Sequence, residues 1–181
     1  GRPGPVLMDL PDDLQRAEIN PDELRPFTIP SEKKDDISNS FDKKFLNLLS
    51  NSKRPLVVPG YGIKLSKTQK KLFEFLKKTN IPVAPSWGAV DLFSSEDEKC
   101  AGTFGVAGTR HGNFAVQNSD LLIVLGCRLN TQLTGAKIET FAKNAKKIVV
   151  DVDEAELTKN NGVKIDLKIN LELNDFFEKI S

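Results

Sequence analysis

The sequence contains little cysteine, carries almost no net charge and lacks any long apolar run. Its two cysteines cannot form a disulfide framework, so we expect a reducing compartment and predict a cytoplasmic protein. The 26 basic residues balance 25 acidic ones, which indicates no nucleic-acid partner and no anionic membrane partner. No run of about 18 apolar residues is present, which argues against a membrane-spanning helix.

Residues that could perform catalysis are also scarce. His111 is the only histidine, and its surroundings indicate neither a metal-ligand cluster nor a catalytic triad. Cys100 and Cys127 form no C-x-x-C motif, and Cys127 is expected to be a packed, inert thiol. Asp151 and Asp153 would point to opposite sides of a strand, so they do not form a general acid–base pair. These residues therefore include no plausible nucleophile–base pair.

Residues 1–36 differ from the rest of the chain. One short apolar run, at 6–10, precedes polar sequence with four prolines, which disfavour helix in the residues before them. This pattern favours an extended linker that lies along a neighbouring domain, with a disordered tail as the alternative. Because the chain begins Gly-Arg-Pro-Gly-Pro, without a Met or an apolar leader, we expect it to belong to a longer protein.

From residue 37 onward, apolar segments of two kinds alternate. Short aliphatic runs such as 121–125 predict strands buried on both faces, and the segments between them have the i, i+3, i+4 spacing of helices. This alternation predicts an α/β domain with a parallel sheet between helical layers. The predicted strands are 55–59, 81–84, 121–125, 147–151 and 165–169, and the predicted helices include 41–49, 66–76, 114–118 and 173–180.

Ligands of such sheets gather at the carboxyl ends of the strands. Glycines follow two predicted strands, at 60–62 and at 126, and Arg128 could pair with a phosphate. The segment 104–113 is the richest in glycine. These features suggest a nucleotide site. Tight strand-to-helix turns also need glycine, however, and 104–113 could equally be a flexible connector.

Five segments resemble thiamine diphosphate enzymes of the acetolactate synthase type. Residues 1–11 resemble the closing strand and exit linker of their pyrimidine-binding domain, and 54–62 resemble the opening of their central domain. Residues 104–123 resemble the stretch G-x-x-G-T followed by A-V-Q-N-S-D-L-L-I. Residues 126–135 and 150–160 resemble G-x-R-x-x-x-x-x-T-G and I-D-I-D-x-x-E-x-x-K-N.

The resemblance implies an architecture and a role. Residues 1–36 would be the end of the preceding pyrimidine-binding domain and its linker arm, and 37–181 would be the central domain. That domain is three-layered, with a six-stranded parallel sheet of Rossmann-like topology related to sirtuins and deoxyhypusine synthase. Its sixth strand would lie near 101–104. An autonomous FAD- or ADP-binding module of the same fold is the alternative.

The parent enzyme implied by the resemblance decarboxylates a 2-keto acid and passes the carbanion to an acceptor. It would bind thiamine diphosphate and Mg²⁺ through flanking catalytic domains, which this domain braces, and would assemble as a homodimer or homotetramer. The resemblance therefore implies that this chain alone catalyses nothing. Related central domains hold FAD or ADP. Carried over by motif, the nucleotide would be bound by Arg2, Gly60, Tyr61, Ser86, Trp87, Gly105, Val106, Gly126, Cys127, Arg128, Asn130, Asp151, Val152 and Glu172.

The sequence departs from the family at two places. The motif R-F-D-D-R-V-T-G reads R-L-N-T-Q-L-T-G at 128–135, so a carboxylate pair and an arginine are replaced. The stretch G-M-H-G-T reads G-V-A-G-T at 105–109, without its histidine. Loss of one Arg–phosphate pair removes roughly 1.5–3 kcal/mol, or about one to two decades of affinity. These changes disfavour FAD and leave another nucleotide, or none, as alternatives.

Overall fold

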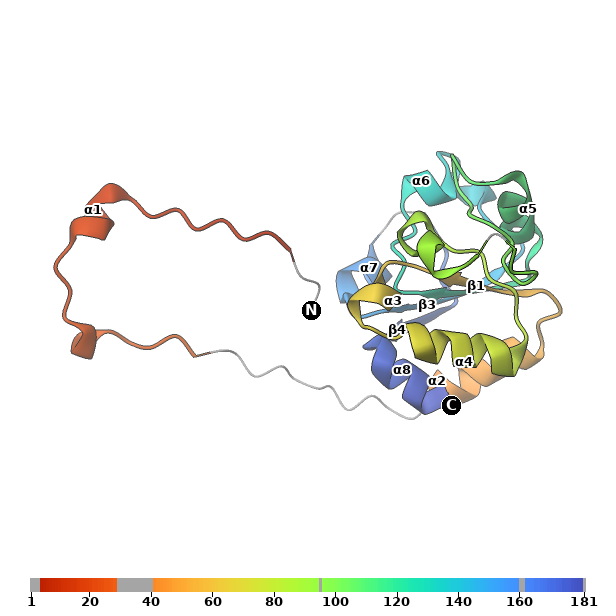
Figure 1. Ribbon diagram of the computed structural model, residues 1–181, viewed down its shortest axis with the longest axis horizontal. Coiled ribbons are helices and arrows are strands. Elements are labelled where there is room, and N and C mark those ends of the chain that lie inside the picture. The colour runs from red at the N-terminus through yellow and green to blue at the C-terminus, as the bar shows by residue number, and fades with distance from the viewer. Residues whose placement is uncertain (1–3, 29–40, 95, 160–161, 181) are drawn as a thin grey trace. The chain divides into compact units, whose positions relative to one another are not determined.

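The computed structural model describes residues 4–28, 41–94, 96–159 and 162–180, which fall into two units (Figure 1). The N-terminal arm, described over 4–28, contains only the short helices α1 (Asp12–Arg16) and η1 (Pro21–Glu23). Every described residue of the arm is exposed, and the apolar side chains of Val6 and Leu7 are 92% and 93% exposed. The apolar run at 6–10 is therefore left open to solvent.

The second unit, which we call the body, is built on a parallel sheet. Within the described residues, its four strands are β1 (Pro55–Pro59), β2 (Leu121–Leu125), β3 (Lys146–Asp151) and β4 (Leu167–Asn170), in the order β1-β2-β3-β4. Each adjacent pair is parallel. All five residues of β2 are buried, as expected for a central strand covered on both sides. The predicted α/β class with a parallel sheet is therefore confirmed.

The prediction of six strands is wrong for this structure, because two of them are reduced to single bridges. Val83 bridges Val57 of β1 and also bridges Cys100, both in parallel. Pro82 lies directly before Val83 and has no N–H to offer a ladder, which limits pairing at this edge. Across the sheet, the chain order of the six segments is nevertheless 3-2-1-4-5-6, the Rossmann order.

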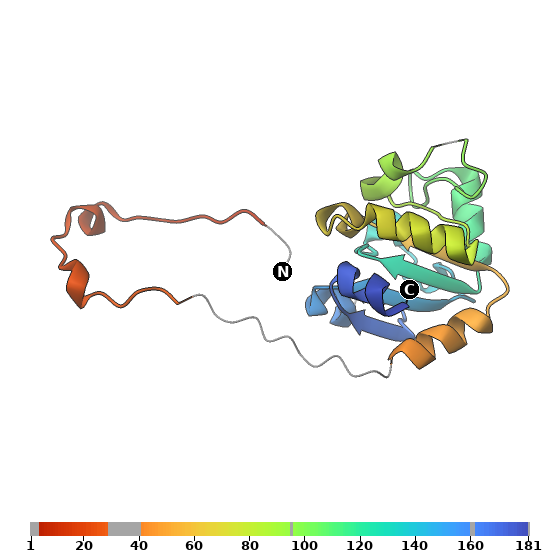
Figure 2. The ribbon, with the colours of Figure 1, turned by 60° about the horizontal axis from the view of Figure 1, so that its bottom comes forward.

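Helices cover both faces of the sheet, so the body has three layers (Figures 1 and 2). Alternate strand residues divide the core: Ile123 faces one helical layer and Val124 faces the other. The first layer contains α2 (Phe41–Ser50), α3 (Gly62–Leu65), α4 (Gln69–Thr79) and α8 (Leu173–Ile180), and the second contains α5 (Arg110–Asn118), α6 (Thr131–Thr134) and α7 (Glu154–Thr158). The short helix η3 (Ile138–Thr140) has no buried residue.

A buried lysine holds the turn that leads into β3. The Nζ of Lys147 donates hydrogen bonds to the carbonyls of Ala142 and Ala145, at 2.9 and 3.0 Å, and only 5% of the residue is exposed. The side chain of Gln117 accepts from the Ala142 N–H at 3.0 Å. Ala142 has a φ of +41°, which an L-residue adopts at a cost. The two side chains therefore clamp a strained turn.

Asp120 ties the start of β2 to the start of β1. Its carboxylate accepts hydrogen bonds from the backbone N–H of Lys53 (2.8 Å) and of Arg54 (2.9 Å), and also from the Ser52 hydroxyl. Burial opposes ionisation of Asp120, but these hydrogen bonds outweigh it and hold its pKa below the ordinary value. The N-S-D-L-L-I part of the family-like motif thus has a structural explanation at this aspartate.

Candidate functional site

The candidate site lies where β1 and β2 end, side by side in the sheet. From β1 the chain continues to the Val83 bridge on one side, and from β2 it continues to β3 on the other. This reversal makes the pair the topological switch point, where α/β proteins place their ligands. Two loops flank it: Gly60–Gly62 after β1 and Gly126–Arg128 after β2, a region we call the switch edge.

The glycines of the switch edge allow its two loops to touch. A Cβ on Gly60 would clash with the carbonyl of Gly126 and lie 2.5 Å from the Cα of Cys127. A Cβ on Gly62 would lie 2.7 Å from the Cα of Gly126. The N–H groups of Gly60 and Gly62 donate to the carbonyls of Leu125 (2.9 Å) and Gly126 (3.0 Å). These amides are therefore used by the chain itself, and a phosphate there would have to be held by other groups.

Two exposed aromatic rings stand at the switch edge. Tyr61 is 54% exposed, and Trp87, in the helix η2 (Trp87–Leu92), is 58% exposed. A Cβ on Gly88 would lie 2.9 Å from the Cβ of Tyr61, so η2 packs directly against the loop that carries Tyr61. Lys64 joins the two segments, because its Nζ lies 5.0 Å from the centre of the Tyr61 ring and 2.9 Å from the Asp91 carboxylate. The structure thus offers two flat surfaces on neighbouring turns.

Arg128 pairs with a carboxylate on α7, the helix that follows the neighbouring strand β3. Its Nε lies 2.6 Å from Oε1 of Glu156 on α7, and Lys159 pairs with the other oxygen of the same carboxylate. The Arg128 side chain is 61% exposed, whereas that of Glu156 is 9% exposed. Burial works against the charge on Glu156, but the two cations outweigh burial and hold its pKa below the ordinary value.

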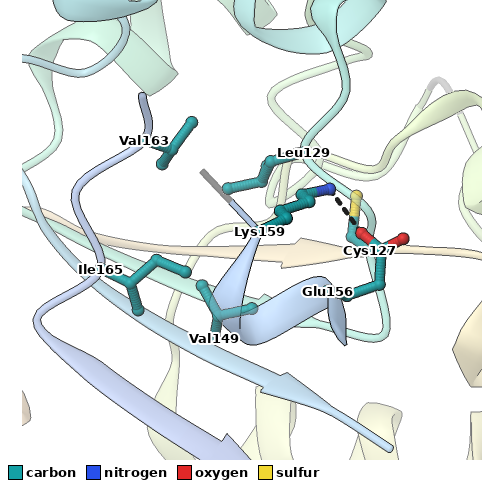
Figure 3. Close-up of a pocket in the computed structure, with 7 residues that line it drawn as sticks. All are labelled: Cys127, Leu129, Val149, Glu156, Lys159, Val163 and Ile165. Carbon is teal, nitrogen blue, oxygen red and sulfur yellow. Dashed lines mark hydrogen bonds and ion pairs between the residues drawn. The ribbon is translucent and has the colours of Figure 1, made fainter. Parts of the chain in front are cut away.

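A cavity of about 10 Å³ lies beside this ion-pair network (Figure 3). That volume is about enough for one water molecule. In Figure 3, the Lys159 ammonium and the Glu156 carboxylate meet next to the sulfur of Cys127. The cavity is lined by Cys127, Leu129, Val149, Glu156, Lys159, Val163 and Ile165.

Two predicted ligand-binding residues are turned into the protein. Cys127 and Ser86 are only 5% exposed each, and burial raises the pKa of the Cys127 thiol to about 12. Since the thiolate is the reactive form, Cys127 is inert at neutral pH. The structure therefore agrees with the expectation of a packed thiol, and contact of either residue with a nucleotide stays a prediction.

Hydrogen bonds within the chain occupy polar groups at the carboxyl end of β3. Asp151 is 3% exposed, and its carboxylate accepts a hydrogen bond from the Asp153 N–H at 3.0 Å. Asn170 of β4 donates its side-chain N–H groups to the carbonyls of Asp151 (3.0 Å) and Val152 (2.9 Å). Sequence reasoning missed Asn170, although a polar residue at the carboxyl end of a strand is a usable signal. Val152 itself is 38% exposed.

Hydrogen bonds hold the glycine-rich segment in a loop between Phe104 and the start of α5. Asn113 clamps Gly105 in both directions, accepting from its N–H at 2.8 Å and donating to its carbonyl at 3.0 Å. The N–H of Val106 donates to the carbonyl of Gln132 at 2.8 Å. Thr109 caps the N-terminus of α5. The Val106 side chain, 70% exposed, is left facing solvent.

The remaining predicted residues are spread over the same edge. Asn130 is exposed and caps the short helix α6 (Thr131–Thr134) by accepting from the Leu133 N–H at 3.2 Å. Glu172 is exposed just after β4. Arg2 lies outside the described residues. Within the described ranges, no three His, Cys, Asp or Glu side chains are placed to hold a metal ion. None of the helices in the described part is long and apolar enough to cross a membrane.

Comparison with known proteins identifies the family. Residues 43–180 match the family described as "Thiamine pyrophosphate enzyme, central domain". Acetolactate synthase 2, chloroplastic, of Nicotiana tabacum is 36% identical over 186 residues, covering 98% of this chain and 28% of that protein. The probable acetolactate synthase large subunit of Methanococcus aeolicus is 36% identical over 172 residues, covering 91% of this chain and 28% of that protein.

The chain thus spans little more than a quarter of the length of these curated relatives. Its Rossmann-ordered sheet, its three layers and the match over 43–180 agree with one another. The chain belongs to the family of thiamine pyrophosphate enzyme central domains.

Proposed function

We propose that this chain is the non-catalytic central domain of a thiamine diphosphate-dependent enzyme of the acetolactate synthase type. Similarity to acetolactate synthases over nearly the whole chain supports the proposal. The parent would decarboxylate a 2-keto acid and pass the carbanion to an acceptor, in the cytoplasm and as a homodimer or homotetramer. Thiamine diphosphate and Mg²⁺ would bind to the flanking catalytic domains, which this domain braces.

The apolar run in the N-terminal arm supports a position for this chain directly after another domain of the parent enzyme. Residues 1–36 would be the end of the preceding pyrimidine-binding domain and its linker, with 37–181 as the central domain. Val6, Leu7 and Met8 are consecutive apolar residues that are 75–93% exposed. A run that is apolar on both sides of an extended chain is stable in water only when another sheet covers it. The preceding domain would supply that cover.

We also propose that the switch edge holds a nucleotide, either FAD or ADP. The observation that carries this proposal is the exposure of Tyr61, Trp87 and Arg128 at the topological switch point. A flat ring would stack on one of the aromatic side chains, and a phosphate would pair with the guanidinium. Since the amides of Gly60 and Gly62 are already bonded within the chain, these side chains would carry the recognition.

A purely architectural role is the second candidate. The packing of Gly60 against Gly126 accounts for these two glycines without any ligand. The replacements at 130–132 and at 107 also remove charged or polar groups that the family resemblance places near a flavin. On this alternative the domain spaces the catalytic domains and its edge binds nothing.

Titration with FAD, ADP and NAD separates the two candidates. Trp87 is the only tryptophan and stands at the switch edge, so its fluorescence reports on occupancy. A nucleotide at a hundredfold excess over its dissociation constant stabilises the fold by about 2.7 kcal/mol. For a chain of this size that raises the melting temperature by roughly 5–10 °C. If none of the three nucleotides changes the melting temperature or the fluorescence, the architectural role is the candidate that remains.

An arginine variant tests where the nucleotide binds. We expect Arg128→Met to weaken binding by about 10- to 100-fold, because it removes a charge-assisted contact. Lys143→Met is the matched control, since Lys143 is an exposed cation away from the switch edge. Equal losses in the two variants would indicate nonspecific attraction to positive charge and contradict a site at Arg128.

A further inference from the structure

The ion-pair network around Arg128 does more than neutralise charge. Arg128 comes from the loop after β2, and Glu156 comes from α7, which follows β3. Their 2.6 Å contact therefore joins the loop after β2 to the helix that follows the neighbouring strand β3. The contact is made through Nε, at one side of the planar guanidinium, and the side chain keeps 61% of its surface exposed. The guanidinium thus still has accessible surface for a second acceptor.

Glu156 is suited to hold an arginine in one place. Its side chain is 9% exposed and sits on a helix, so its own position is well defined, whereas Arg128 is long and has many rotamers. An arginine fixed in advance loses less rotamer entropy when a ligand binds, which improves affinity by about three- to tenfold.

Lys159 completes the arrangement. It pairs with the second oxygen of Glu156, at the rim of the small cavity shown in Figure 3. When a phosphate pairs with Arg128, the buried carboxylate of Glu156 still has the ammonium of Lys159 as a partner. An isolated buried carboxylate would be costly, so this second cation allows Arg128 to serve two anions.

We propose that Glu156 is a positioning residue, which holds the Arg128 guanidinium ready for a phosphate-bearing nucleotide at the switch edge. This inference rests on the nucleotide site proposed above. The opposite reading is that Glu156 competes with the phosphate for Arg128. The two readings predict changes of opposite sign when the carboxylate is removed.

A double-mutant cycle tests the proposal in the purified protein, with FAD and ADP titrations followed by Trp87 fluorescence. We expect Glu156→Gln to weaken binding by about three- to tenfold in the presence of Arg128. In an Arg128→Met background, the same change should have no further effect. Glu154→Gln, an exposed carboxylate on the same helix, is the matched control and should leave affinity unchanged.

The outcomes separate three cases. If the unchanged protein binds neither nucleotide, the nucleotide site is refuted, and the positioning role with it. If it binds, but Glu156→Gln binds equally well or more tightly, only the positioning role fails. An equal loss with and without Arg128 would show that Glu156 merely supports the local fold. Should Glu156→Gln fail to fold, Glu156→Met replaces it, because it fills the same volume without an unpaired buried polar group.

Discussion

Replacement of Lys147 by methionine should destabilise the protein substantially. Lys147 donates two hydrogen bonds, to the carbonyls of Ala142 and Ala145, from a residue that is only 5% exposed. Methionine keeps the apolar length of the side chain and removes the ammonium, so packing is largely retained. Two buried carbonyls would then lose their donor, at about 1–3 kcal/mol for each unsatisfied group.

The charge on Lys147 works in the opposite direction. Burial disfavours the ammonium and lowers the pKa of Lys147, with only partial compensation from Asp166. Removing a buried charge therefore recovers part of what the hydrogen bonds lose. With both effects counted, we expect Lys147→Met to lower the free energy of unfolding by about 2–4 kcal/mol.

Urea denaturation of the protein and of two variants measures this effect. Lys146→Met is the matched control: Lys146 is the neighbouring residue, its side chain is 60% exposed, and its ammonium pairs with Asp166 at 3.1 Å. We expect that control to lose less than about 1 kcal/mol. A loss below about 0.5 kcal/mol for Lys147→Met would refute the reasoning, because the desolvation of the ammonium would then cancel both hydrogen bonds.

Three further predictions concern backbone conformation and pH. Gly60→Ala should lower the free energy of unfolding by more than about 3 kcal/mol, because the new Cβ would clash with the backbone of Gly126. Gly135→Ala should lower it by only about 1–3 kcal/mol of backbone strain, since Gly135 has a φ of +79° but no atom within 4 Å of the new Cβ. Thermal denaturation ranks the two variants, and the reverse order would contradict contact between the two loops. Lys67→Gly should stabilise the fold by about 0.5–1 kcal/mol, since Lys67 has a φ of +56°, and a lower melting temperature would contradict this. Burial raises the folded-state pKa of Cys127 to about 12, so at high pH the folded state retains a proton that the unfolded state loses. The free energy of unfolding should therefore fall by up to about 1.4 kcal/mol per pH unit above about pH 9. Denaturation curves of Cys127→Val from about pH 8 to 11 should show a smaller fall, and a fall identical to that of the unchanged protein would refute the assignment.

The sheet was predictable where aliphatic residues run without interruption. Residues 121–125 contain only Leu, Ile and Val, and β2 has these same bounds. At 81–84 the same logic overestimates the strand: Pro82 removes a donor, and the pairing is reduced to isolated bridges from Val83 to Val57 and to Cys100. Apolar composition therefore located the central strands, whereas the number of ladder hydrogen bonds at the edge depended on individual prolines.

The candidate site was predictable only in part. The loops at the switch edge follow from strand ends, which a sequence reveals, and the exposure of Trp87 and Tyr61 is compatible with the predicted site. The partner of Arg128 was not predictable, because Glu156 is 28 positions away and meets it only through the pairing of β2 with β3. The use of the glycine amides within the chain also required coordinates, since a Gly-x-Gly segment has the same sequence whether it binds a phosphate or packs against a loop.

The replacements at 130–132 change the charge of the switch edge but keep the backbone contacts that hold its loops. Asn130 caps α6 as an aspartate there would, and Gln132 holds Val106 through its backbone carbonyl, which any residue could supply. The local fold therefore uses a capping oxygen at 130, which asparagine and aspartate both supply, and a backbone carbonyl at 132, which does not depend on the side chain. Any phosphate at this edge would then depend on a single arginine, and the carboxylate that orients that arginine would matter more here than in a site with two arginines.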